Sequence, residues 1–289
     1  KVIEPAEKHL VNYTTDVHKI LEDDSIKLST LATPSNTHYE LGKKIMNAGM
    51  DVLIEKPLTL KSDKAKELME IAYEKELVLQ VGHIFRYHPA IIELKKRIEK
   101  DNFGKILHIN SNRLSFRVPR KNMGVLHALA IHEVDIFKYL LGEKPSEITC
   151  LNRSNVREGI EDTSFLTVQF PSGVVGHSIE SWLFPVFDKK RELIIVGEEK
   201  SAMVNYLQPN EITIYERRIS SSNNFNLIDT GSFKVKTEDR EPLKEEIMDF
   251  LRCVQKREEP KANSQVGLEA VKMVEKAMKS SKEKRTITL

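Results

Sequence analysis

The chain has 289 residues, with 45 Lys and Arg against 43 Asp and Glu, so its formal net charge is only +2. This length suits two domains, and so small a net charge gives no reason to expect nucleic acid as a partner. No stretch approaches the ~18 apolar residues of a membrane span, so no membrane association is expected. Cys150 and Cys253 lie far apart without a metal-binding spacing, which indicates a reducing, cytoplasmic environment.

The first part of the chain alternates between strand and helix patterns. Helices are expected at residues 16–24, 39–48 and 62–75, and strands at residues 28–33, 51–54 and 77–81. Asp16 and Ser62 are expected to cap the first and third of these helices. Alternation at this spacing predicts βαβ units and therefore an α/β domain built on a parallel sheet.

The pattern changes after Gly82, where strands follow one another between helices. Helices are expected at residues 89–100, 125–141, 243–256 and 265–281, and strands at residues 104–113, 148–152, 164–170, 174–182, 193–196, 202–206 and 211–217. Residues 217–240 are polar and are expected to form a loop. This order predicts an α+β domain with a large, mostly antiparallel sheet. We place the boundary near residues 81–86, which gives one domain at residues 1–84 and a second at residues 85–289.

Lys56 follows the short apolar run from Val52 to Ile54, within the sequence Glu55-Lys56-Pro57. Pro57 cannot donate a ladder hydrogen bond, so the strand should stop there. Ligands of open α/β sheets bind at the carboxyl ends of the strands, which makes Lys56 a candidate for chemistry. Alternatively, Lys56 only caps a strand at the surface.

Two other stretches place polar groups where a ligand could bind. The turn from Ala32 to His38 follows a buried strand, and its Pro and hydroxyl residues would let a ligand approach the backbone. It could equally be an ordinary turn that caps the next helix. The stretch from Gly82 to Pro89 brings Arg86 and Tyr87 to the domain junction, where they suit polar contacts to a sugar or phosphate, or else simple packing between domains.

His132 lies in a strongly apolar helix pattern, with Ala128 and Asp135 on the same helix face. A buried imidazole suits general acid or base chemistry near neutrality, although a structural histidine bonded to Asp135 is a common alternative. No set of residues has the spacing of a metal site, so no metal is expected. The chain also lacks GxSxG, Walker and GxGxxG motifs.

Taken in order, the turn Ala32-Thr-Pro with His38, the Glu55-Lys56-Pro57 strand end, the Gly82-His stretch and the helix with His132 resemble the Gfo/Idh/MocA oxidoreductases. The resemblance implies a Rossmann domain followed by an α/β domain, with NAD or NADP as cofactor. Lys56 and His132 would be the catalytic residues. Cofactor contacts are implied for Thr33, Pro34, Asn36, His38, Glu55, Lys56, Pro57 and Arg86. Substrate contacts are implied for Lys56, Arg86, Tyr87, Arg120, His127, His132 and Asp135.

Later segments are similar to the branch of this family that acts on UDP-N-acetylglucosamine or its uronate at the sugar 3-position. They are Glu161-Asp-Thr163, the stretch from Ser181 to Gly197, and Arg117-Val-Pro-Arg120. The resemblance therefore implies a small-molecule sugar or nucleotide-sugar substrate. A polyol or free-sugar dehydrogenase is the alternative within the family, and a non-catalytic subunit that binds a nucleotide or nucleotide sugar is the alternative outside enzymes.

Two departures from the family pattern stand out. Many members carry Asp four residues before the histidine, where this chain has Ala128, and His127 is rotated about 100° around the helix. The strand, Gly-rich turn and helix that open such a Rossmann domain are also missing. We interpret residues 1–5 as the end of the second strand and expect the N-terminal strands of the sheet to be omitted from this sequence.

An antiparallel sheet covered by helices on one face should bury its other, apolar face against a second subunit. A homodimer or homotetramer through the C-terminal sheet is therefore expected. The residues expected near this layer are Val168, Phe170, Val174, Ile179, Ile194 and Val196.

Overall fold

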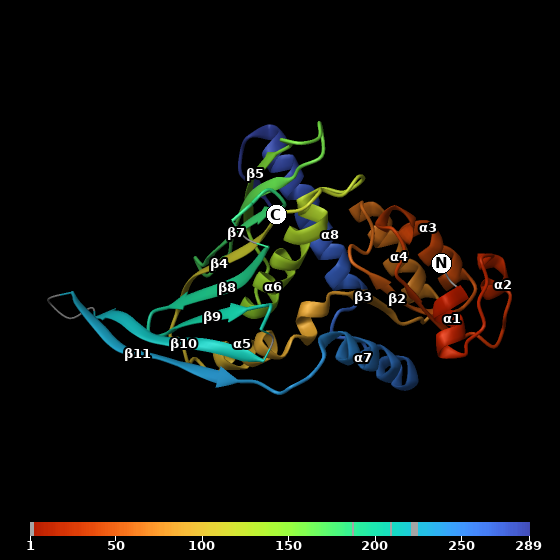
Figure 1. The fold of residues 1–289 in the computed structure, drawn as a ribbon, viewed down its shortest axis with the longest axis horizontal. Helices are drawn as coiled ribbons and strands as arrows, with labels where there is room; N and C mark the ends of the chain where they lie inside the picture. The colour runs from red at the N-terminus through yellow and green to blue at the C-terminus, as the bar shows by residue number, and fades with distance from the viewer. Residues whose placement is uncertain (1–2, 187, 209, 221–224) are drawn as a thin grey trace.

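The computed structural model describes residues 3–186, 188–208, 210–220 and 225–289, and the strands of this part form two sheets (Figure 1). The smaller sheet has the order β1-β2-β3, with β1 at Leu28–Leu31, β2 at Asp51–Glu55 and β3 at Leu79–Gly82. Both pairings are parallel, as predicted. Helices α3 (His38–Asn47) and α4 (Ser62–Glu74) connect these strands. Val52 and Ile54 of β2 are fully buried, which explains the apolar run in the sequence.

The N-terminal residues differ from the expected strand. Residues 3–9 form helix α1 (Ile3–His9), while residues 1 and 2 lie outside the described part. The pattern read as a strand end is therefore wrong, because one apolar pair cannot distinguish a strand from a short helix. Helix α2 (Val17–Leu21) follows, and the Asp16 carboxylate accepts a hydrogen bond from the His18 N–H at 3.0 Å, as expected of an N-cap.

The larger sheet has the order β11-β10-β9-β8-β4-β7-β6-β5-β12. Among the described strands of this sheet, only β4 and β7 pair in parallel, so the sheet is mostly antiparallel, as predicted. Its strands are β4 (Ile106–Ser115), β5 (Glu147–Arg153), β6 (Thr163–Gln169), β7 (Val175–Ser181), β8 (Lys189–Gly197), β9 (Ser201–Asn205), β10 (Glu211–Ser220), β11 (Asn226–Lys236) and β12 (Ile287–Thr288).

Strand β11 occupies part of the segment that the sequence predicted as a loop. It pairs with β10 in a long hairpin that projects from the body of the molecule (Figure 1). Residues 221–224 of the expected loop lie outside the described part. The prediction was wrong because β11 is largely exposed on both faces, so its residues do not alternate between apolar and polar. Polar cross-strand pairs such as Arg217 with Asp229 hold it instead.

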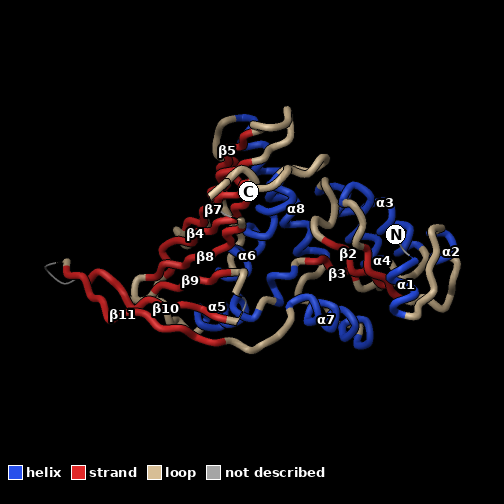
Figure 2. The backbone as a smooth tube through the Cα atoms, viewed as in Figure 1, coloured by secondary structure: helices blue, strands red, loops and turns tan. Residues whose placement is uncertain are grey.

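Helices cover one face of the larger sheet (Figure 2). They are α5 (Pro89–Glu99), α6 (Ile131–Leu141) and α8 (Ser264–Glu283), and they share one hydrophobic core with the sheet. Val168, Phe170 and Val174 belong to this core and not to the open face on which they were expected. Successive side chains of a strand alternate between the two faces of a sheet. The open face therefore carries the strand residues that do not point into the core, among them Ile179, Ile194 and Val196.

Helix α6 is preceded by a π-helical turn, Leu126–Ala130, and ends at Gly142 with a left-handed φ of 70°. The sequence predicted one continuous α-helix over residues 125–141, since a π-helical turn has no sequence pattern of its own. Such turns often occur at functional sites. Here the turn lies next to the carboxyl end of β2, where Lys56 reaches it.

Helices α7 (Pro242–Lys256) and α8, from the end of the chain, pack on the small parallel sheet. The Val81 N–H donates to the Ala262 carbonyl at 2.8 Å, and Phe250 of α7 packs on Leu53. Ser62 was expected to cap α4, but Lys61 takes the cap position, and the Ser62 hydroxyl donates to Glu275 of α8 at 2.5 Å. The C-terminal helices thus fix one sheet against the other.

Within the described ranges, no helix combines the length and apolar character needed to cross a bilayer.

Gly267 of α8 tests this packing. A Cβ atom at Gly267 would lie 2.7 Å from Val81 Cγ2 and 3.1 Å from Leu58 Cβ. Although alanine favours helices, we expect Gly267→Ala to lower the free energy of unfolding by about 1–3 kcal/mol, because the helix must move away from the sheet. Lys272→Ala, at an exposed position of the same helix, is the control and should change stability little. Equal stability of the two variants in urea titrations would contradict this packing.

Candidate active site

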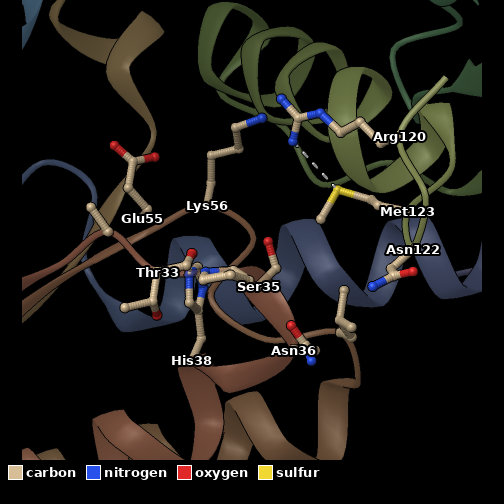
Figure 3. A pocket seen from close by; sticks show the side chains of 12 residues that line it. Thr33, Ser35, Asn36, His38, Glu55, Lys56, Arg120, Asn122 and Met123 are labelled. Atoms are coloured by element: carbon tan, nitrogen blue, oxygen red, sulfur yellow. Dashed lines mark hydrogen bonds between the residues drawn. The ribbon is translucent and has the colours of Figure 1, made fainter. Parts of the chain in front are cut away.

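A cavity of about 340 Å³ opens at the carboxyl ends of β1 and β2 (Figure 3). Its volume falls within the usual range of small-molecule sites. The turn after β1 forms one wall, the end of β2 forms the floor, and the segment before the π-helical turn forms the opposite wall. The lining residues are Ala32, Thr33, Pro34, Ser35, Asn36, His38, Glu55, Lys56, Leu60, Arg120, Asn122 and Met123.

The turn after β1 is fixed by its own hydrogen bonds. Thr33 and Thr37 share a hydroxyl contact of 2.7 Å, and Thr37 Oγ1 also donates to the Pro34 carbonyl. The buried ring of His38 lies between the Thr33 carbonyl, at 2.9 Å from Nε2, and the Pro57 carbonyl, at 2.8 Å from Nδ1. His38 therefore joins the ends of the two strands and holds the cavity open between them.

Lys56 crosses from the small sheet to the second domain, where its Nζ donates to the Ala128 carbonyl at 2.8 Å. The Lys56–Pro57 peptide bond is cis. Burial lowers the pKa of Lys56 to about 7, and the positive charges of Arg113, Arg120 and Arg191 act in the same direction while Glu55 opposes them. Near neutral pH, a large fraction of Lys56 is thus uncharged and able to accept a proton.

The side-chain directions in Figure 3 agree with these opposing effects on the pKa of Lys56. Lys56 and Arg120 extend toward the same point from opposite walls, whereas the Glu55 carboxylate points away from the Lys56 ammonium. Ala128 offers only its backbone carbonyl, so this position supplies no negative charge to Lys56. The π-helical turn is itself held by Glu161, whose carboxylate accepts the Leu126 N–H at 3.1 Å.

His132 lies on the first turn of α6, buried beside Phe85, with the two rings perpendicular and 5.0 Å apart. Its Nδ1 has no hydrogen-bond partner among the described residues. Burial lowers the pKa of His132 well below its usual value, and the nearby charges of Lys56 and Arg113 lower it further. The imidazole is therefore neutral at physiological pH and available as a hydrogen-bond acceptor.

Arg86, Tyr87 and Asp135 are engaged away from this cavity. Arg86 forms a bidentate pair with Asp135, with Nη2 2.6 Å and Nε 3.0 Å from the carboxylate. The Tyr87 hydroxyl donates to Asp249 at 2.8 Å, and Tyr87 lines a different cavity of about 870 Å³ beside α5 and α7. These polar atoms join the segment after β3 to α6 and α7, and the ligand contacts expected of these residues stay a prediction.

His127 also turns away from the cavity. It lies at the domain junction, where burial lowers its pKa while the Leu60 carbonyl and Glu275 act in the opposite direction. Pro57 contributes its carbonyl to His38 and does not line the cavity itself. The structure thus gathers Thr33, Pro34, Asn36, His38, Glu55, Lys56 and Arg120 around one cavity, with His132 electrostatically coupled to Lys56.

Sequence reasoning missed Arg113, Arg191, Ser35, Asn122 and Met123. The three cavity residues carry no distinctive pattern. The sequence does contain a signal for the two arginines, because each occupies a strand position whose side chain faces the core. A charged residue in an inward phase requires a buried partner or a ligand. Across the described residues, no cluster of three or more His, Cys, Asp or Glu is placed to hold a metal ion.

The cavity suits the nicotinamide end of a dinucleotide. Hydroxyl and amide groups of Thr33, Ser35 and Asn36 face it from the β1 turn, and Lys56 supplies a donor at its floor. These groups match the hydroxyls of a ribose and the amide of a nicotinamide. The donor set therefore fits this part of the cofactor, which Thr33, Asn36 and Lys56 would hold.

Comparison with known proteins identifies the family. A sequence model described as "Oxidoreductase family, NAD-binding Rossmann fold" matches residues 1–83, and one described as "Oxidoreductase family, C-terminal alpha/beta domain" matches residues 95–289. The second match alone spans more than half of the chain. The chain therefore belongs to the Gfo/Idh/MocA family of oxidoreductases, as its motifs indicated.

Similar proteins include sugar and polyol dehydrogenases. UDP-N-acetylglucosamine 3-dehydrogenase of Acidithiobacillus ferrooxidans is 32% identical over 190 residues, which cover 65% of this chain and 58% of that enzyme. The scyllo-inositol 2-dehydrogenase (NAD(+)) of Bacillus subtilis is 28% identical over 220 residues, 72% of this chain and 64% of that enzyme. The matched stretches thus span less than two thirds of either relative.

Solved structures show the same fold. The structure of the A. ferrooxidans enzyme superposes with a TM-score of 0.82 at 25% identity, covering 97% of this chain and 86% of that one. Levoglucosan dehydrogenase in complex with NADH and levoglucosan gives a TM-score of 0.83 at 20% identity, covering 99% and 87%. The second likeness concerns the fold alone.

The lowered pKa of Lys56 can be measured directly. In protein whose lysines carry ¹³C-methyl groups, we expect one NMR resonance to titrate near pH 7, because the environment of Lys56 lowers its pKa from the ordinary value of 10.5 to about 7. This resonance should be absent from Lys56→Met and present in Lys272→Met. If no lysine resonance titrates below about pH 9, the described environment of Lys56 is wrong.

Proposed function

We propose that this chain is part of a cytoplasmic, NAD- or NADP-dependent dehydrogenase that oxidises a ring hydroxyl of a sugar. The observation that carries the proposal is Lys56, whose pKa is lowered to about 7 and whose Nζ lies at the floor of the cavity beside the buried His132. Such a group is poised to exchange protons at neutral pH, and perturbed pKa values of this kind are characteristic of active sites.

Oxidation of a carbinol requires the hydroxyl proton to leave as the hydride departs. Uncharged Lys56 accepts this proton, and the neutral imidazole of His132 accepts a hydrogen bond that orients the hydroxyl. The cationic neighbours Arg113 and Arg120 favour the uncharged form of Lys56, so the base is regenerated at neutral pH. When bound, the nicotinamide cofactor supplies the redox chemistry by accepting the hydride.

The substrate that we propose is a UDP-N-acetylhexosamine or its uronate, oxidised at position 3. The similarity to UDP-N-acetylglucosamine 3-dehydrogenase and the positive charge of Arg120 in the cavity wall support this choice. The similarity to scyllo-inositol 2-dehydrogenase supports a polyol or free-sugar dehydrogenase as the second candidate. A non-catalytic binding subunit, suggested by Ala128, would bind the same ligands without turnover. Activity on a panel of UDP-sugars, free sugars and inositols separates the three.

Replacing Lys56 tests the proposed chemistry. Lys56→Met keeps the length of the side chain but removes the proton acceptor, so we expect turnover to fall at least about 100-fold, to background. Cofactor binding, measured by NADH fluorescence, should stay within about tenfold of the unmodified protein, because several groups of the β1 turn remain. Lys272→Met is the matched control. Undiminished turnover by Lys56→Met would overturn the assignment of Lys56, whereas an absence of turnover in the unmodified protein would favour the non-catalytic alternative.

We also propose that two or more copies associate through the open face of the larger sheet. This face carries Ile179, Ile194 and Val196, all only partly buried, together with the exposed Leu151 and Phe165. Register places Leu151, Phe165 and Ile179 side by side on three adjacent strands. A contiguous apolar surface of this kind is typical of a subunit interface.

Light scattering at about 10 µM protein should therefore give a multiple of the monomer mass. Phe165→Lys combined with Ile179→Lys should shift the population toward monomer, because charges would face the partner across an apolar layer. Tyr73→Lys, at an exposed position on α4, is the control and should leave the mass unchanged. A monomer for the unmodified protein would contradict the proposal.

A further inference from the structure

Strands β4 and β8 place two arginines directly opposite each other. Arg113 is in register with Arg191, and both follow the phase of core-facing residues such as Leu193. Side chains opposite each other on antiparallel strands are only about 5 Å apart at Cβ, and like charges in such a pair destabilise the sheet. A buried pair of cations therefore requires negative charge nearby.

Arg113 is fully buried, and only part of its hydrogen-bond donors have an acceptor. Its Nε donates to Glu133, and the guanidinium lies between the rings of Phe85 and Tyr206, 4.3 and 4.8 Å from their centroids. Neither Nη1 nor Nη2 has a hydrogen-bond acceptor within the described part of the chain. Buried donors nearly always have an acceptor, so Glu133 alone does not meet the donor capacity of Arg113.

The carboxylates around this pair do not balance its charge. Arg191 has no carboxylate within ion-pair distance among the described residues, and Glu133 is already shared with Arg113. Burial raises the pKa of Glu180 to about 8, with a contribution from the charge of Glu133, so Glu180 is protonated at neutral pH. The exposed Arg117 adds further positive charge, which lowers the pKa of Arg191 together with burial and Arg113.

The arginine pair is close to the reacting groups. The Arg113 guanidinium lies 4.3 Å from the centroid of Phe85, and the same ring contacts His132 at 5.0 Å between centroids. In agreement with this geometry, the charges of Arg113 and Arg191 both lower the pKa of Lys56 and that of His132. A group held by Arg191 would therefore belong to the same molecule whose hydroxyl meets Lys56. A guanidinium presents parallel N–H donors that match the oxygens of a carboxylate or a phosphate, and a neutral hydroxyl would leave the charge uncompensated.

We propose that Arg191, supported by Arg113 behind it, binds an oxyanion carried by the sugar, and that this contact selects anionic sugars over neutral ones. The inference rests on the proposed dehydrogenase function. Arg191 is the contacting residue because its side chain is partly exposed, whereas Arg113 is held by Glu133 and two aromatic rings. A uronate carboxylate and a nucleotide diphosphate share the required chemistry, and the experiment must distinguish them.

Arg191→Met is the test, with three substrates: UDP-N-acetylglucosamine uronate, UDP-N-acetylglucosamine and free N-acetylglucosamine. If the anion is the carboxylate, the ratio of kcat/KM for the uronate to that for UDP-N-acetylglucosamine should fall at least about tenfold. If the anion is the diphosphate, the ratio of kcat/KM for UDP-N-acetylglucosamine to that for the free sugar should fall instead. Arg191→Lys should restore part of the lost preference, because lysine keeps the positive charge but lacks the two parallel N–H donors of the guanidinium.

Arg217→Met, on the exposed hairpin and paired with Asp229, is the matched control and should leave both ratios unchanged. An equal loss on all three substrates would overturn the inference and assign Arg191 a structural role. If the unmodified protein oxidises none of them, the proposed function fails, and calorimetric titration of the two UDP-sugars still decides the inference. Equal binding by the unmodified protein and Arg191→Met would then refute it.

Discussion

The hydrogen bond from Lys56 Nζ to the Ala128 carbonyl connects the two halves of the site. Lys56 comes from the end of a buried parallel strand, and Ala128 comes from a π-helical turn of the second domain. Because the acceptor is a neutral carbonyl and not a carboxylate, it orients the ammonium without stabilising its charge strongly. Position and basicity of the lysine are thus set by different groups: the carbonyl fixes where Nζ lies, and burial with neighbouring arginines sets its pKa.

The neutral Ala128 beside Lys56 has an electrostatic consequence. An aspartate would hold Lys56 protonated and would keep a nearby histidine charged. Here burial lowers the pKa of both groups, neighbouring cations lower it further, and Glu55 is directed away from Lys56. The same positive charge that lowers the pKa of Lys56 also attracts anions, so the proton transfer and the substrate selection that we propose depend on one set of arginines.

Much of the fold followed from sequence patterns that have local physical causes. The buried run before Lys56 and the helix punctuation at Asp16 and Gly142 were interpreted correctly, because strand burial and helix ends leave residue-level signals. The π-helical turn, the exposed hairpin and the first helix were not, since their stability comes from distant contacts or from polar pairs. For the same reason, sequence alone could not reveal that Arg86 and Tyr87 bind Asp135 and Asp249.

The packing of α7 and α8 on the small sheet has a consequence for biosynthesis. Val81 and Leu53 find their partners Ala262 and Phe250 only after the intervening strands of the larger sheet have been translated. The strands of the small sheet are thus made before the helices that cover them, and their apolar surface is uncovered in the meantime. Contacts so far apart along the chain slow folding and favour aggregation of the nascent protein.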